Sequence, residues 1–179
     1  MSKLKSVKVL TTCALMVALA AILGIFKIPI NQFVEIRFGS FPIAIAGAFF
    51  GPVPGMIVGA LADVVQFFVK PTGPYFPGFT ISSAVAGLLY GLVLHTKTDK
   101  VSIPRIIISQ TLYTIVVGLL INTFNLCILF GKFADQGPSV YFAYMLTRLP
   151  KEAIMYPINT ILLFIILKPA YIVKNKLEM

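Results

Sequence analysis

The sequence predicts an all-α integral membrane protein with six transmembrane helices, both termini in the cytoplasm and a ligand pocket in the extracellular half. Of its 179 residues, 58% are hydrophobic and 12% are charged, and the mean hydropathy is +0.94. A soluble domain carries about 25% charged residues, so the bilayer is the expected solvent. At about 20 residues per span, the chain has room for five or six helices and for no sizeable soluble domain. We therefore expect residues 1–179 to form one membrane domain.

The first three spans follow from apolar runs and from the residues that end them. The first run resembles a signal peptide, but it continues past its Ala18-Leu19-Ala20 motif, so we expect an uncleaved helix with a cytoplasmic N-terminus. Residues 27–37 form an external loop. The second run ends in a Gly-Pro-Val-Pro-Gly turn, in which Pro54 suits the first turn of a third helix.

The last three spans are divided by a polar segment at 95–105 and by an external loop at 131–137, and the chain ends with Lys174 and Lys176 near its C-terminus. His95, where an apolar run ends, is interpreted as an interfacial cap. The six expected spans are 9–26, 38–50, 54–69, 78–94, 106–130 and 144–172.

The basic residues lie at the ends of these spans. Nine Lys and Arg residues fall on the predicted cytoplasmic side and six fall outside, so the positive-inside rule supports this orientation weakly. The net charge of +9 does not indicate nucleic-acid binding, because no basic stripe exists away from the membrane edges. The external cations need another use, and they are Lys27, Arg37, Lys70, Lys132, Arg148 and Lys151.

The stretch Thr72–Thr80, Thr-Gly-Pro-Tyr-Phe-Pro-Gly-Phe-Thr, lies between the third and fourth spans and cannot be a continuous helix. Exposed aromatic rings are poorly soluble in water, and the irregular backbone of such a loop is poorly accommodated in lipid. We therefore expect a flat ligand to cover the rings. Tyr75, Phe76 and Phe79 are therefore candidate ligand contacts.

Asp63 is the only acid deep inside a predicted span, and a buried carboxylate is by default a functional candidate. Gly55, Gly59, Asp63 and Gln66 recur on one helical face, where the glycines let a neighbouring helix approach and the polar residues face inward. Asp63 then contacts a ligand or pairs with Arg37, and the sequence leaves both readings open.

Two further polar faces point to the same half of the bundle. Arg148 begins a face with Glu152, Met155 and Asn159, and Lys151 is adjacent; we place these cations at the start of the sixth helix, where they oppose the helix dipole and where an anionic ligand or pairing with Glu152 and Asp135 gives them a use. Asn122 shares a face with Gly118 and Asn125, and such amides bind a heterocycle or join helices.

Several activities have no residues to carry them. The sequence has no phosphate-binding Gly-rich loop ending in Gly-Lys-Ser/Thr, no nucleophile triad, and only one His with two Cys in apolar runs, so we expect no catalytic residues, no metal and no cofactor. Nor does it show the inverted halves of many secondary transporters.

The order of five short motifs resembles the substrate-binding S subunits of energy-coupling factor (ECF) vitamin transporters across the whole chain. Among these proteins it is most similar to the folate-type S subunits, mainly through PTGPYFPGFT at 71–80. The motifs are Ala14-x-x-x-Ala18, RFGSFPIA at 37–44, GPVPG at 51–55, GALAD at 59–63 and FPGFT at 76–80.

The resemblance implies a multi-pass protein of the bacterial cell membrane that binds folate or a related pterin. It also implies a partner module of one transmembrane subunit and two ATPases, docking at Ala14 and Ala18, with gates at 27–37 and 70–77. Folate suits the residues independently: a pterin ring can stack on the aromatic stretch and donate to Asp63, and its glutamate carboxylates suit Arg148, Lys151 or Arg37. The alternatives are a riboflavin-like vitamin or autonomous secondary transport of an aromatic anion.

Overall fold

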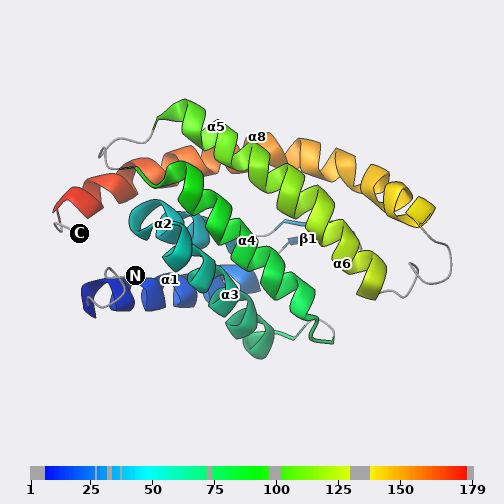
Figure 1. Ribbon diagram of the computed structural model, residues 1–179, viewed down its shortest axis with the longest axis horizontal. Helices are drawn as coiled ribbons and strands as arrows, with labels where there is room; N and C mark the ends of the chain where they lie inside the picture. Colours follow the sequence, from blue (N-terminus) through cyan, green and yellow to red (C-terminus); the bar gives the residue numbers. More distant parts are fainter. Residues whose placement is uncertain are drawn as a thin grey trace.

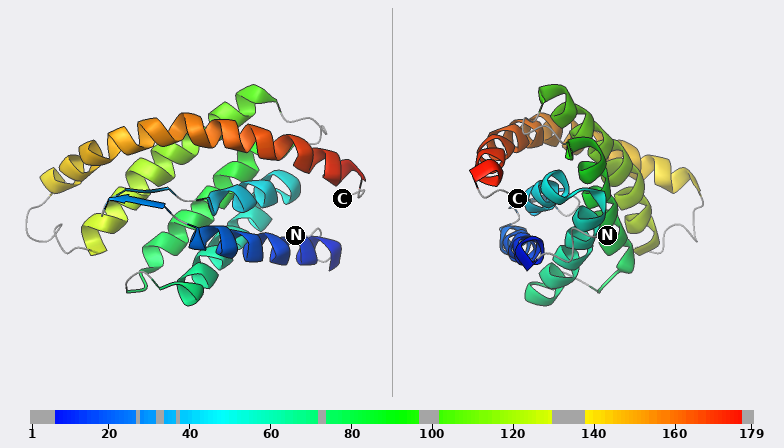
Figure 2. Two further views of the ribbon diagram at one scale, coloured as in Figure 1. Left: turned by 180° about the vertical axis from the view of Figure 1, so that it is seen from behind. Right: turned by 60° about the vertical axis from the view of Figure 1, so that its left-hand side comes forward.

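The computed structural model describes residues 7–26, 28–31, 34–36, 38–71, 74–96, 102–129 and 138–176. Its helices form an elongated bundle in which the first residues of α1 and the last of α8 lie at the same end (Figures 1 and 2). The elements are α1 (Val7–Ile25), β1 (Ile28–Asn31), β2 (Val34–Ile36), α2 (Ser40–Phe50), α3 (Pro52–Val69), α4 (Pro77–Leu94), α5 (Ile103–Leu112), the π-helix η2 (Tyr113–Ile121), α6 (Asn122–Leu129) and α8 (Pro138–Lys176).

Five helical stretches in the described residues are long and apolar enough to cross a bilayer: Val7–Ile25, Pro52–Val69, Pro77–Leu94, Ile103–Leu129 and Ser139–Ile172. The helix α2 is apolar but has only 11 residues. The helical membrane fold is thus as predicted, while the count of six spans and the side on which the termini lie stay predictions.

The first external loop was not expected to contain regular structure, and here the all-α prediction is incomplete. The strands β1 and β2 pair antiparallel, with Ile28 opposite Ile36 and Pro29 opposite Glu35. The register shifts between Pro29 and Asn31, as expected where proline cannot donate to the ladder. The rest of the loop, including Arg37, lies outside the described residues.

The helix α2 lies at the centre of one half of the bundle, and most of its residues are buried. A helix that is apolar all round is expected to be surrounded in this way. Its C-terminal end is fixed by Gly51, whose φ of 99° favours glycine, and by a bond from the Gly51 N–H to Gly47 O. Tyr171 donates to Ala48 O at 3.3 Å, and the His95 ring nitrogen Nδ1 lies 3.1 Å from the same oxygen. His95 thus caps a helix end.

The helices α3 and α4 pack with their backbones in close contact. A Cβ added at Gly87 would overlap the Gly55 oxygen, and one added at Gly59 would overlap the Ser83 oxygen. The small residues on the α3 face therefore do what the sequence predicted, since they let α4 approach. The connection between these two helices lies at the end of the bundle opposite the start of α1 (Figures 1 and 2).

Candidate ligand-binding site

A cavity of about 540 Å³ lies among the helices, in the half that carries the α3–α4 connection. This volume falls in the range of small-molecule sites, roughly 300–1,000 Å³. Residues from α1, α2, α3, α4, η2, α6 and α8 line it. The lining brings together seven of the eight predicted ligand-binding residues, namely Asp63, Tyr75, Phe76, Phe79, Asn122, Arg148 and Lys151. Arg37, the eighth, lies outside the described residues.

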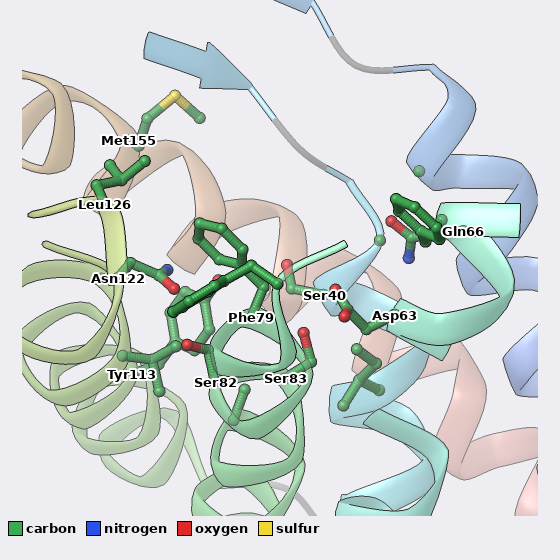
Figure 3. Close-up of a pocket in the computed structure, with 18 of the residues that line it drawn as sticks. Ser40, Asp63, Gln66, Phe79, Ser82, Ser83, Tyr113, Asn122, Leu126 and Met155 are labelled. Carbon is green, nitrogen blue, oxygen red and sulfur yellow. The ribbon is translucent and has the colours of Figure 1, made fainter. Parts of the chain in front are cut away.

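The polar half of the α3 face supplies one wall of the cavity. Thr80 Oγ1 donates to Asp63 Oδ2 at 2.7 Å, and the Tyr75 hydroxyl lies 2.8 Å from Thr80 Oγ1. Asp63 extends from α3 towards the cavity near Ser40 and Ser83 (Figure 3). The aromatic stretch and the carboxylate are thus connected by hydrogen bonds through one threonine.

Gln66 of α3 and Lys70, the residue that follows α3, tie this wall to α1, and the sequence did not single out this connection. Gln66 Nε2 donates to Ala20 O at 3.1 Å, and Lys70 Nζ donates to Ile25 O at 3.4 Å. A cation near the last carbonyls of α1 is favoured by the helix dipole. The external charge at Lys70 therefore has a structural use.

The aromatic residues of the predicted stretch cluster at the N-terminus of α4. The rings of Phe76 and Phe79 meet edge to face, with centroids 5.9 Å apart, and Tyr75 packs against Phe67 at 5.0 Å. Phe79 extends into the middle of the cavity in Figure 3. Thr72 and Gly73 lie outside the described residues. The rings offer apolar edges and faces that a flat ligand can contact.

The continuous stretch of α5, η2 and α6 forms the wall opposite α3. Asn122 lines the cavity, whereas Asn125 is buried and its Nδ2 donates to Ser82 Oγ at 2.9 Å. The two amides thus divide the roles that the sequence left open, since Asn125 joins helices and Asn122 faces the cavity. Tyr113 also lines the wall. We did not predict it because an α-helical spacing places it opposite Asn122.

The helix α8 supplies the charged wall. Arg148 and Glu152 are 6% and 8% exposed, and Lys151 Nζ lies 3.5 Å from Glu152 Oε1. Met155 and Asn159 continue the same face along the cavity, as predicted. The placement of Arg148 at a helix start was wrong. Because α8 begins at Pro138, ten residues earlier, the dipole of the first turn does not act on it.

The described lining holds two carboxylates, Asp63 and Glu152, and three cations, Lys70, Arg148 and Lys151. Such a site can bind a ligand with hydrogen-bond donors at one end and anionic groups at the other. Across the described part of the chain, no three His, Cys, Asp or Glu residues gather as metal ligands would. The two cysteines, Cys13 and Cys127, are buried and not bonded to each other.

The predicted docking residues lie apart from the cavity. Ala14 and Ala18 are exposed on α1 and do not line it. Their helix carries several exposed large apolar side chains, including Val7, Leu10 and Ile22.

Comparisons with known proteins agree on one family. Residues 8–167 match the family model described as "ECF transporter, substrate-specific component". The chain is 38% identical over 161 residues to the folate transporter FolT of Clostridium novyi, covering 90% of this chain and 88% of that protein. It is 26% identical over 146 residues to FolT of Leuconostoc mesenteroides, covering 82% and 77%. A crystal structure of FolT bound with folic acid superposes with a TM-score of 0.76 at 28% identity, covering 89% and 92%.

Proposed function

The chain belongs to the family of substrate-specific components of ECF transporters, and from this premise we propose that it is the folate-binding member, which captures folate and delivers it to an ATP-driven module. The observation that carries this proposal is the cavity. It joins Asp63, the Phe76 and Phe79 rings and the α8 cations in a chain that is 38% identical to a folate transporter.

The two ends of the cavity suit the two ends of folate. The amino-pyrimidine edge of a pterin presents N–H donors, which the Asp63 carboxylate can accept, while the ring contacts Phe76 and Phe79. The glutamate tail carries two carboxylates, for which Arg148 and Lys151 are charge-matched donors. Arg37 is proposed as a further contact on the basis of its sequence position alone.

The orientation in the membrane is part of the same proposal. We place both termini in the cytoplasm and the cavity in the extracellular half of six spans, in a multi-pass protein of the bacterial cell membrane. The ends of α1 and α8 lying together support an even number of passes (Figure 1). The segments at 27–37 and 70–77 are proposed as gates.

The proposed partner is a module of one transmembrane subunit and two ATPases. Ala14 and Ala18 are one helical turn apart on an exposed face of α1, and small residues at this spacing let a second membrane helix approach closely. We therefore assign the docking contact to this face.

Titration of the purified chain with folate tests the ligand. We expect binding at nanomolar concentration, measured by calorimetry and by a folate-dependent rise in the unfolding temperature. Riboflavin and biotin are titrated in the same way. If the chain binds either of them but does not bind folate, the proposal of folate as the substrate is wrong. Uptake by the chain alone in vesicles under an ion gradient would instead indicate an autonomous secondary transporter.

A further inference from the structure

The wall formed by α5 and α6 contains an unusual segment between them. Tyr113–Ile121 is a π-helix, and the N–H of Asn122 that follows it bonds to Val117 O, five residues earlier. Most π-helical segments are single turns inserted in an α-helix, and they occur frequently at functional sites. A π-helix of nine residues in a cavity wall is therefore expected to affect which side chains face the cavity.

The wider turn changes which residues face the cavity. Nine residues separate Tyr113 from Asn122, which is about two and a half α-helical turns, so an α-helix would place them on opposite faces. A turn closed by i→i+5 bonds holds about 4.4 residues, so the same nine residues make about two turns. In the structure both side chains line the cavity, and both lie beside Phe79 in Figure 3.

The outward-facing residues show the same register. Ile115 and Leu120 are 48% and 44% exposed, and neither lines the cavity. Seven residues separate Tyr113 from Leu120, which is about two α-helical turns, so an α-helix would turn Leu120 inward and Asn122 outward. The π-helix has the opposite effect, because it turns the Asn122 amide towards the cavity and the apolar Leu120 side chain away from it.

Tyr113 is also held rigidly on that wall. Its ring stacks on Tyr90, with centroids 5.3 Å apart and planes inclined by 22°. Tyr90 is 2% exposed, and its hydroxyl donates to Gln110 Oε1 at 3.0 Å. A pre-positioned ring loses little conformational freedom when a ligand binds, and the nearby amide of Asn122 offers both a donor and an acceptor to a heterocycle.

We propose that η2 sets the register of the cavity wall and thereby makes Tyr113, together with Asn122, a specificity-determining contact for the flat ring of the ligand. The inference rests on the proposed function in taking that ligand to be a hydrogen-bonding heteroaromatic vitamin. The register itself is a property of the chain and can be measured without any ligand.

Cysteine labelling in lipid nanodiscs tests the register. In a chain carrying Cys13→Ala and Cys127→Ala, single variants Tyr113→Cys, Asn122→Cys, Ile115→Cys and Leu120→Cys are reacted with a water-soluble maleimide. We expect the first two to react at least tenfold faster than the last two, and saturating folate to slow both. Faster labelling at 120 than at 122 would mean an α-helical register and would overturn the proposal.

The ligand part is tested separately. If the Tyr113→Cys variant binds folate but its labelling is not slowed by it, Tyr113 is no contact and that part of the inference falls. If unmodified protein binds no folate, the proposed function fails, while the labelling pattern without ligand still decides the register. Tyr113→Phe is expected to keep folate affinity within about threefold of the unmodified chain, and Tyr113→Leu is expected to lower it at least tenfold. Equal folate affinities of these two variants would exclude a ring contact.

A deletion series provides a second test that does not depend on cysteine. Removing Ile115 and Leu120 together shortens two π turns to the length of two α turns, so Tyr113 and Asn122 keep one face. We expect this double deletion to bind folate within about threefold of the unmodified chain. A loss of more than tenfold in a double deletion whose ligand-free unfolding temperature is unchanged would contradict the register argument.

Discussion

Replacing Asp63 by asparagine is expected to weaken folate binding about 10- to 100-fold. The Asp63 carboxylate lines the cavity and accepts from Thr80 Oγ1 at 2.7 Å. A hydrogen bond to a charged acceptor contributes about 1.5–3 kcal/mol, more than one to a neutral group. Since each 1.4 kcal/mol is about tenfold in the dissociation constant, losing the charged acceptor for the pterin donors gives roughly this range. The amide oxygen of asparagine can still accept from Thr80, so the local fold is kept.

The assay is calorimetric titration of each purified variant with folate, with the unfolding temperature measured without ligand. Thr80→Val removes the hydroxyl that joins Asp63 to Tyr75 but keeps the carboxylate, and we expect it to weaken binding less than about fivefold. Asp63→Asn within threefold of the unmodified affinity, or a larger loss for Thr80→Val, would refute the carboxylate contact.

The same series separates ligand contact from the alternative in which Asp63 pairs with Arg37. A structural pair would be needed without ligand, so Asp63→Asn and Arg37→Gln would each lower the unfolding temperature of the ligand-free protein, and the double variant would lower it no further. A ligand contact instead lowers folate affinity and leaves the ligand-free unfolding temperature nearly unchanged.

The remaining predictions concern the ring contacts, the docking face and the packing of the bundle. Phe76→Ala should weaken folate binding by roughly 1–3 kcal/mol in the same titration, and an unchanged affinity would remove Phe76 from the site. Ala18→Trp should leave folate binding intact but block uptake in vesicles that contain the ATP-driven module. The control Leu19→Trp, on another exposed face of α1, should leave uptake unchanged. Uptake that survives Ala18→Trp would exclude this docking face. Gly87→Ala should destabilise the fold by about 1–3 kcal/mol because its Cβ would overlap a backbone oxygen of α3. Leu92→Ala, on the exposed face of α4, is the control. Equal unfolding temperatures of these two variants would count against the packing argument.

The sequence predicted the helices well where Pro and Gly interrupt apolar runs. The α3–α4 break was expected because Pro74, Pro77 and the neighbouring glycines cannot continue a helix, and α3 ends at Val69 while α4 begins at Pro77. The α3 face was also predictable, because an undistorted α-helix repeats every 3.6 residues. Gly55 and Gly59 therefore contact α4, and Asp63 lines the cavity.

Three features were not predictable from patterns of this kind. No residue pattern in the stretch 106–130 marks the change from α to π spacing that brings Tyr113 into the site. The helix α8 starts at Pro138, where a proline is tolerated in the first turn, six residues before the start expected at residue 144. The β1–β2 pair is too short for its alternation to stand out among loop residues.

The proposed ligand site and the proposed docking helix share a physical connection through α3. Gln66 lines the cavity and donates to Ala20 O, two residues beyond Ala18 on α1, and Lys70 holds the C-terminal carbonyl of the same helix at Ile25. A Cβ at Gly24 would overlap the Gln66 side chain, so α1 and α3 are in close contact there. Any shift of α3 at Gln66 on ligand binding therefore acts directly on α1. Gly24 and Ile25 of α1 also line the cavity, so a bound ligand can act on this helix both directly and through Gln66.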